Sequence, residues 1–220
     1  MSRSIREIVF LLSSFGNLVH YLSTHPCLLS GGGISLERKR LQFILEVAIL
    51  GAISFVLDKI GFSMPQGGSI TLSMLPIIVM AFRWGIAGGM LTGFVSGLLQ
   101  LLMGGYVFNA IQAALDYFVA YTFVGLAAVT LGWLLHSKAA GKKGSMVTAI
   151  VVGTVIGGLL RYLIHFIGGI VFFGSYAPEG QPVWLYSLVY NGSYMIPAIL
   201  VTAVITSLLF TSAPRLLQRN

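Results

Sequence analysis

Residues 161–176, RYLIHFIGGIVFFGSY, have the composition of the end of a membrane-spanning helix that carries two basic side chains. Arg161 and His165 stand four residues apart in this apolar stretch, so they share one face of a helix. A charged side chain at the centre of a bilayer costs roughly 2.5–3.5 kcal/mol, and therefore normally faces protein or a water-filled cavity. The stretch predicts a helical membrane protein with a polar interior.

The composition of the whole chain is that of an integral membrane protein. Of its 220 residues, 56% are hydrophobic and 9% are charged, and the mean hydropathy is +0.91. A soluble domain carries roughly 25% charged residues. Twenty-seven glycines favour closely packed helices over the alternating strands of a β-barrel. Cys27 is the only cysteine, which excludes an intramolecular disulfide framework and disfavours a Cys-rich metal site.

Apolar stretches separated by Gly, Pro or basic breaks predict an all-α fold with six transmembrane helices. The predicted spans are about 42–60, 70–82, 84–104, 107–135, 146–173 and 183–211. The second is short for a bilayer that needs about 20 residues, so we expect it to tilt or to be shielded by its neighbours. Residues 41–212 form the predicted membrane domain, and 213–220 form a short basic tail.

The basic residues predict cytoplasmic N- and C-termini, because Lys and Arg concentrate on cytoplasmic loops. In this orientation only Lys59 lies on an external loop. The inner ends then carry Arg38, Lys39, Arg40, Arg83, Lys138, Lys142, Lys143, Arg215 and Arg219. The net charge of +7 therefore indicates topology, because these residues do not form the patch interleaved with aromatics that a nucleic-acid surface needs.

Residues 1–40 are predicted to be an N-terminal extension whose role the sequence leaves open. The segment IVFLLSSFGNLVHYL (8–22) follows two arginines as a signal-peptide core or an interfacial helix would, but no small-residue cleavage pattern follows it. The alternatives are a peripheral segment, a start codon placed too far upstream and a seventh span. A seventh span would reverse the N-terminus and leave the rest unchanged.

Two acidic residues lie within predicted spans, Glu46 near the inner end of the first and Asp116 well inside the fourth. Asn109, Gln112 and Asp116 follow i, i+3, i+7 spacing and share one helix face. At about 1.5 Å per residue, Asp116 lies roughly 10 Å below Asn109 at the outer end. An acid at this depth needs a partner.

Polar residues of the last two predicted spans lie at the same depth as Asp116. His165 is about 12 Å from the outer end of its helix, and Tyr186 and Asn191 are in the first turns of the last. Because neighbouring spans run in opposite directions, we expect one outward-facing cavity in which Arg161 neutralises Asp116. The predicted roof is the loop MPQGGS (64–69), and the predicted walls are Tyr106, Tyr117, Phe172, Phe173 and Tyr176.

Such a cavity suits a small heteroaromatic cation. Ring faces attract positive charge, and an amide beside a carboxylate can pair with the donor and acceptor edge of a heterocycle. Taken singly, each feature has a structural alternative, since an Asp–Arg pair or an isolated His can serve packing and Tyr collects at membrane interfaces. It is their expected convergence that favours a binding site.

Four stretches, in this order and within this layout, resemble the thiamine-specific S component of energy-coupling-factor (ECF) vitamin transporters. They are MPQGGSITLSMLPIIVMAFRWG (64–85), QAALDYFVA (112–120), RYLIHFIGGIVFFGSYA (161–177) and YSLVYNG (186–192). The resemblance covers about 42–211 and implies a six-helix S-component fold in the bacterial plasma membrane. It also implies high-affinity thiamine capture at the outer face, without enzymatic activity.

The resemblance implies which residues bind the substrate. By matched position they are Tyr106, Asp116, Tyr117, Arg161, His165, Phe173, Tyr186 and Asn191. The family more often has Glu at Asp116 and Trp at Phe173, and it can have Lys at Arg161. These differences bear on affinity more than on the class of ligand.

The resemblance also implies partners, namely a transmembrane coupling subunit and two ATPase subunits. The chain itself has no G-x-x-x-x-G-K-[ST] sequence for ATP. Ala48 and Ala52 have the small-xxx-small spacing that permits close helix approach. In S components such a surface docks on the coupling subunit, and internal packing is the alternative.

Three other functions remain open on the sequence. The chain could be an S component for another vitamin or a thiamine precursor, or a solitary permease that couples import to a proton through Asp116 or His165. An intramembrane hydrolase with His165 as base and Ser193 as nucleophile is the third, but the chain lacks a G-x-S-x-G elbow.

Overall fold

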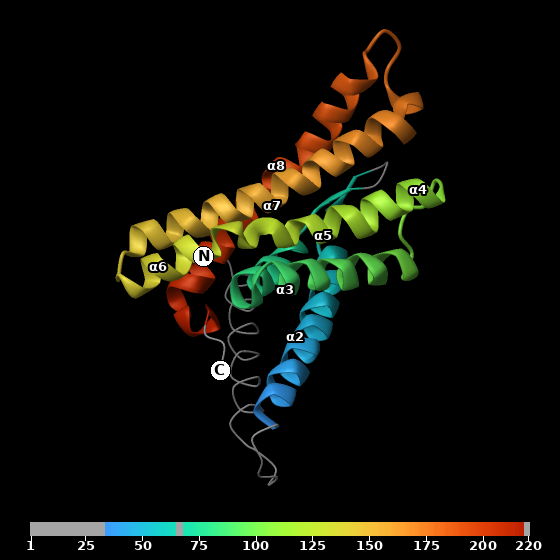
Figure 1. Cartoon of the computed structure of the whole chain (residues 1–220). Helices are drawn as coiled ribbons and strands as arrows, with labels where there is room; N and C mark the ends of the chain where they lie inside the picture. Colours follow the sequence, from blue (N-terminus) through green and yellow to red (C-terminus); the bar gives the residue numbers. More distant parts are fainter. Residues whose placement is uncertain (1–33, 65–67, 218–220) are drawn as a thin grey trace.

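The computed structural model describes residues 34–64 and 68–217, which form a helical bundle with one short hairpin (Figure 1). In chain order the main elements are α2 (Ile34–Lys59), β1 (Phe62–Ser63), β2 (Ser69–Ile70), α3 (Met74–Leu102), α4 (Ala110–Ala113), α5 (Ala120–Val124), α6 (Leu131–Ala139), α7 (Lys143–Phe172) and α8 (Val183–Ser212). A π-helical stretch, η1 (Ala114–Val119), joins α4 to α5, and a 3-10 stretch, η2 (Gly125–Thr130), joins α5 to α6. Most of the predicted extension 1–40 lies outside the described residues.

Within the described residues, five helices are long and apolar enough to cross a bilayer, one fewer than the six predicted. They are Glu37–Lys59, Met74–Leu102, Ala110–Ala139, Lys143–Phe172 and Val183–Ser212. The difference lies in α3, which contains the second and third predicted spans. At Gly85 its backbone has φ 80° and ψ −167°, a conformation that glycine adopts without a steric penalty. The segment before Gly85 therefore covers only about 16 Å, against a hydrocarbon core of about 30 Å.

This short first segment of α3 forms the centre of the core. Every side chain from Met74 to Phe82 is buried, including Met80 and the two isoleucines Ile77 and Ile78. The expectation that neighbouring helices shield the second span is thus confirmed. Because it is shielded on all sides, the segment can end inside the protein without exposing its backbone to lipid.

A glycine stripe on the second segment of α3 brings it against the next span. Gly93 and Gly97 stand one turn apart, and a Cβ at either position would collide with the backbone of Tyr121 or Tyr117. Small residues at this spacing let two helix backbones approach closely. The stripe therefore fixes the part of the fourth predicted span that carries Tyr117 and Tyr121.

Successive helices pack as neighbours. Figure 1 shows α3, the α4–α6 span and α7 side by side, with α8 along α7 and α2 crossing α3. The antiparallel β1–β2 hairpin pairs Phe62 with Ile70 and contacts α8. Far from it, Arg83 Nη1 donates to the Leu216 carbonyl at 3.0 Å and Lys138 Nζ to the Pro214 carbonyl at 2.8 Å. Two basic residues predicted for the inner face therefore lie beside the C-terminal segment.

Candidate ligand-binding site

A cavity of about 300 Å³ lies beneath the hairpin, and its lining comes from the hairpin and every membrane-length helix of the described chain. All eight residues that the sequence analysis proposed for substrate binding line it: Tyr106, Asp116, Tyr117, Arg161, His165, Phe173, Tyr186 and Asn191. Met64, Gly68 and Ser69 of the predicted roof also line it, and residues 65–67 lie outside the described part.

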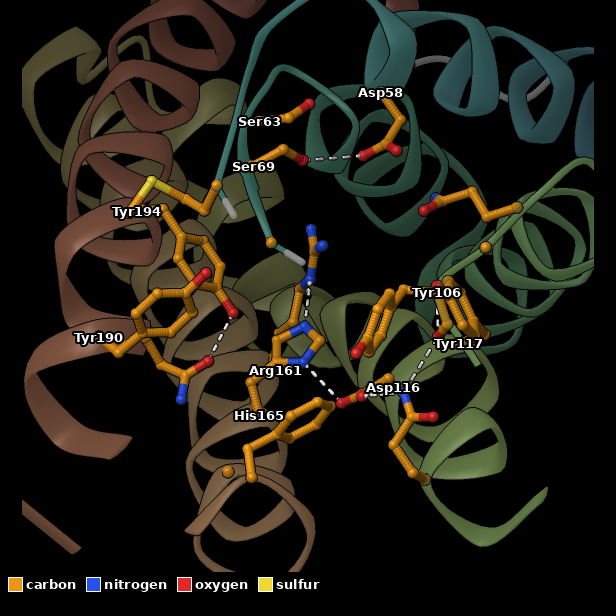
Figure 2. A pocket seen from close by; sticks show the side chains of 18 of the residues that line it. Asp58, Ser63, Ser69, Tyr106, Asp116, Tyr117, Arg161, His165, Tyr190 and Tyr194 are labelled. Carbon is orange, nitrogen blue, oxygen red and sulfur yellow. Dashed lines mark hydrogen bonds and ion pairs between the residues drawn. The ribbon is translucent and has the colours of Figure 1, made fainter. Parts of the chain in front are cut away.

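Asp116 lies on the π-helical stretch η1, an irregularity that is frequent at functional sites. Its Oδ1 is 2.9 Å from His165 Nδ1, and its Oδ2 accepts from Gln112 Nε2 at 2.6 Å. Arg161 Nε donates to His165 Nε2 at 3.3 Å (Figure 2). Because a guanidinium only donates, His165 accepts at Nε2, and Nδ1 carries the hydrogen that Asp116 receives. The carboxylate therefore keeps its charge toward the cavity.

The sequence left open whether Arg161 and Asp116 pair directly, and in the structure His165 links the two through this relay. Arg161 is 5% exposed, and its guanidinium carbon lies 3.9 Å from the centre of the Tyr121 ring. Nη2 donates to the Tyr121 hydroxyl at 2.7 Å and Nη1 to Ser73 Oγ at 3.4 Å. Arg161 thus spans three protein partners and holds His165 in place.

Aromatic rings form two walls of the cavity. On α8, Tyr186 stacks on Tyr190 with ring centres 5.7 Å apart, and Tyr190 meets Tyr194 edge-on at 6.1 Å. Figure 2 shows Tyr190 and Tyr194 across the cavity from Tyr106 and Tyr117. The cavity therefore has aromatic rings on both sides.

The outer wall departs in part from the prediction. The Phe173 ring centre lies 6.1 Å from those of Tyr106, Phe108 and Tyr176. The Tyr176 hydroxyl is also 3.3 Å from that of Tyr106. Phe172, the fifth predicted wall residue, ends α7. We predicted that Tyr176 and Phe172 would line the cavity, but neither is among its lining residues.

Several lining residues were missed in the sequence analysis. Asp58, at the end of α2, accepts at Oδ1 from Tyr121, Thr71 and Ser69 over 3.3–3.5 Å. Tyr190 and Tyr194 follow Tyr186 at four-residue spacing, so helical periodicity contained the signal for both. The missed lining residues are Asp58, Lys59, Ser63, Gln100, Gly104, Gly105, Tyr121, Gly169, Tyr190 and Tyr194, whereas Gln112 lines the cavity beside Asp116, whose helix face it was predicted to share.

Two further residues have roles that the sequence did not indicate. Asn109 shares a helix face with Asp116 in the sequence, but its Oδ1 caps α4 by accepting from the backbone of Ile111 and Gln112. Ser193 is exposed on α8 and donates to the Tyr190 carbonyl at 2.7 Å. His165 instead contacts Asp116 and Arg161, so the nucleophile and base of the hydrolase alternative do not meet.

Ala48 and Ala52 are both exposed on α2. They lie in a strip of exposed apolar side chains, whereas Glu46, Leu50 and Ser54 on the other face are buried. The strip consists of Leu41, Ile44, Leu45, Ala48, Ile49, Ala52, Val56 and Ile60. Internal packing therefore does not explain the small-xxx-small pair.

The bundle is similar to two solved structures. A structure described as that of the S component of a bacterial ECF transporter matches with a TM-score of 0.54 at 18% identity, over 82% of this chain and 99% of that chain. ThiT from Listeria monocytogenes matches with a TM-score of 0.77 at 33% identity, over 81% of this chain and 98% of that chain. The fold and its cavity define a multi-pass membrane protein of the S-component fold.

Sequence comparison gives the family. Residues 44–218 match the family described as thiamine transporter protein. Thiamine transporter ThiT of Bacillus subtilis is 41% identical over 84% of this chain and 98% of its own length. Its counterpart in Lacticaseibacillus paracasei is 36% identical over 82% and 92%. This chain belongs to the thiamine transporter family, which confirms the resemblance stated above and the prediction of a transport protein rather than an enzyme.

Proposed function

We propose that this protein captures thiamine with high affinity at the outer face of the bacterial plasma membrane and delivers it to an ATP-driven ECF importer. Its family and its ThiT relatives support this function. The observation that carries it is the charged carboxylate of Asp116, which lines a cavity between two aromatic walls. Thiamine is a two-ring ligand with a fixed thiazolium charge. The aromatic walls suit its rings, and the carboxylate suits its charge.

The lining residues divide into charge, stacking and hydrogen-bonding groups. Asp116 attracts the thiazolium, and ring faces such as those of Phe173 and Tyr106 favour a flat cation. Tyr186 and Asn191 orient the ligand by hydrogen bonding, Tyr117 closes the wall beside Asp116, and His165 links the carboxylate to Arg161. No covalent step is involved.

The proposed topology has cytoplasmic N- and C-termini and an external hairpin. Arg83 and Lys138 beside the C-terminal segment support it, because basic residues concentrate on the cytoplasmic side. In this topology the chain crosses six times, and the short α3 segment before Gly85 completes the second crossing together with residues 71–73. Such irregular backbone is tolerated at membrane depth only where protein surrounds it, as it does here.

The proposed partners are a transmembrane coupling subunit and two ATPase subunits, with the Ala48–Ala52 strip of α2 docking on the coupling subunit. The exposure of both alanines supports this assignment. Bulky side chains there would keep a partner helix at a distance, without reaching the cavity on the far side of α2.

Thiamine titration of the detergent-purified protein by isothermal calorimetry tests the ligand. Calorimetry is preferable to tryptophan fluorescence for this chain, because Trp84, Trp133 and Trp184 are not among the cavity-lining residues. We expect tight binding that the Asp116→Asn substitution weakens and that Glu179→Gln, on an exposed loop, leaves unchanged. Tighter binding of another vitamin or of a thiamine precursor would replace thiamine in the proposal.

Transport in vesicles tests the partners. The double variant Ala48→Trp/Ala52→Trp should bind thiamine normally but lose uptake in vesicles that contain the coupling and ATPase subunits. Ser193→Trp is the matched control, since Ser193 is an exposed small residue of α8. Uptake by the protein alone, driven by a proton gradient, would instead establish the solitary permease.

A further inference from the structure

The side-chain amide of Asn191 is held in a single orientation by its neighbours. Its Nδ2 donates to the Ser187 carbonyl at 2.9 Å and to Ser187 Oγ at 3.2 Å. Ser187 Oγ donates its own hydrogen to the Phe166 carbonyl at 2.7 Å, so toward Asn191 it can only accept. Two acceptors therefore face the amide nitrogen.

The other side of the amide is fixed by Tyr194. The Tyr194 hydroxyl donates to Asn191 Oδ1 at 2.6 Å, and both residues line the cavity. If the amide were flipped, Oδ1 would face the Ser187 carbonyl, and two oxygens without a hydrogen would be in contact. Burying such unpaired acceptors costs about 1–3 kcal/mol, so the flipped orientation is excluded.

The surroundings leave little room for the three residues to rearrange. A Cβ at Gly169 would lie 3.0 Å from Asn191 Nδ2 and would collide with Ser187 Oγ. A Cβ at Gly68 of the hairpin would lie 2.6 Å from the Tyr194 ring. Ser187 is fully buried, and Asn191 is 6% exposed. What the amide retains for a ligand is the second lone pair of Oδ1.

We propose that Tyr194 and Ser187 are positioning residues, which orient the Asn191 amide so that it offers the ligand an acceptor and no donor. This inference rests on the proposed function and extends it to specificity. Thiamine has two groups that can donate to Oδ1, the exocyclic amino group of its pyrimidine and the hydroxyl of its hydroxyethyl chain. We assign the contact to the amino group, because it is held rigidly in the plane of a flat ring. The orientation of Asn191 thus selects ligands that carry this amino group.

The test compares thiamine with its deamino analogue, in which a hydrogen atom replaces the pyrimidine amino group, by calorimetry. The wild-type protein should prefer thiamine by at least about tenfold, because the analogue leaves Oδ1 short of a donor. In Tyr194→Phe/Ser187→Ala the amide loses two of its three protein hydrogen bonds and keeps only the one from Nδ2 to the Ser187 main-chain carbonyl. It can then swing away from that carbonyl and donate to a ring nitrogen that both ligands share. The preference should then fall to within about threefold.

Two further variants distinguish positioning from packing. Asn191→Leu removes the amide and should lose the same preference. Tyr162→Phe removes a hydroxyl that donates across the same α7–α8 pair, to the Leu188 carbonyl at 2.9 Å, and should keep the wild-type preference. A double variant that weakens both ligands equally and keeps their ratio would overturn the inference, as would a preference that survives in Asn191→Leu.

The result on the wild-type protein separates this inference from the proposed function. Equal affinity for thiamine and the deamino analogue would overturn the inference while leaving thiamine capture in place. Binding of neither ligand by the folded protein would overturn both.

Discussion

Glu46 and Asp116 are both acidic residues within membrane-spanning helices, but the protein uses their hydrogen-bonding capacity differently. Glu46, which is 3% exposed, accepts four hydrogen bonds. The donors are Arg83 Nε at 2.6 Å, Arg83 Nη2 at 2.9 Å, Trp84 Nε1 at 2.6 Å and Gln42 Nε2 at 2.9 Å. Asp116 is paired with His165 and Gln112, and its remaining capacity faces a cavity.

The difference shows what separates a structural carboxylate from a binding one. A carboxylate has about four lone-pair sites. Glu46 fills all of them with protein donors and joins α2 to the α3 segment before Gly85. Asp116 leaves part of its capacity unused beside aromatic rings, which is the condition for meeting a cation. Position within a membrane-spanning helix does not by itself distinguish the two roles.

The largest effect on stability is expected at Glu46. Glu46→Gln removes the carboxylate charge that faces the guanidinium of Arg83, whose side chain is 11% exposed. Breaking a buried ion pair in this way costs about 3–5 kcal/mol, so thermal unfolding in detergent should shift strongly downward. Thiamine affinity of the remaining folded protein should not change. Glu37→Gln, at an exposed position of the same helix, is the control.

Asp116→Asn should have the opposite effect to Glu46→Gln, with a small change in stability and a large loss of thiamine affinity. The amide oxygen can still accept from His165, although the amide nitrogen cannot accept from Gln112 Nε2 as Oδ2 does. The unfolding temperature of the empty protein should therefore fall less than in Glu46→Gln. Thiamine affinity should fall about 10- to 100-fold, because hydrogen bonds and contacts to a charged group are lost. If this variant instead unfolded early and bound thiamine normally, the contrast between the two carboxylates would be reversed.

Arg161→Lys tests the relay behind Asp116 and should have an intermediate effect. A lysine keeps the positive charge but cannot span His165, Tyr121 and Ser73 at once. We expect thiamine affinity to fall about tenfold, with the loss of one positioning hydrogen bond to His165. Arg215→Lys, exposed near the C-terminus, should leave affinity unchanged. A loss as large as that of Asp116→Asn would show that Arg161 contacts the ligand itself.

Hydropathy and helical periodicity predicted the membrane class, the region of most helices and the convergence of eight residues on one cavity. They did so because chain direction and 1.5 Å per residue fix depth without side-chain detail. The predicted spans 70–82 and 84–104 placed a break within two residues of Gly85, but the backbone conformation of Gly85 and the π-helical stretch at Asp116 were not predictable in this way, since both depend on tertiary packing. The choice of His165 as the direct partner of Asp116 likewise depends on side-chain geometry.

Asp58 is the lining carboxylate that the sequence analysis passed over, because it stands at the end of a span beside Lys59 rather than within the apolar stretch. Asp58→Asn should have the smallest effect, lowering thiamine affinity by less than about fivefold. Asp58 is half-buried, and its three donors are hydroxyls at 3.3–3.5 Å that an amide oxygen can still accept. Calorimetry beside Asp116→Asn measures the difference. Equal losses in the two variants would place the thiazolium between the two carboxylates. The binding carboxylate that we contrast with Glu46 would then be a pair, Asp58 and Asp116, instead of Asp116 alone.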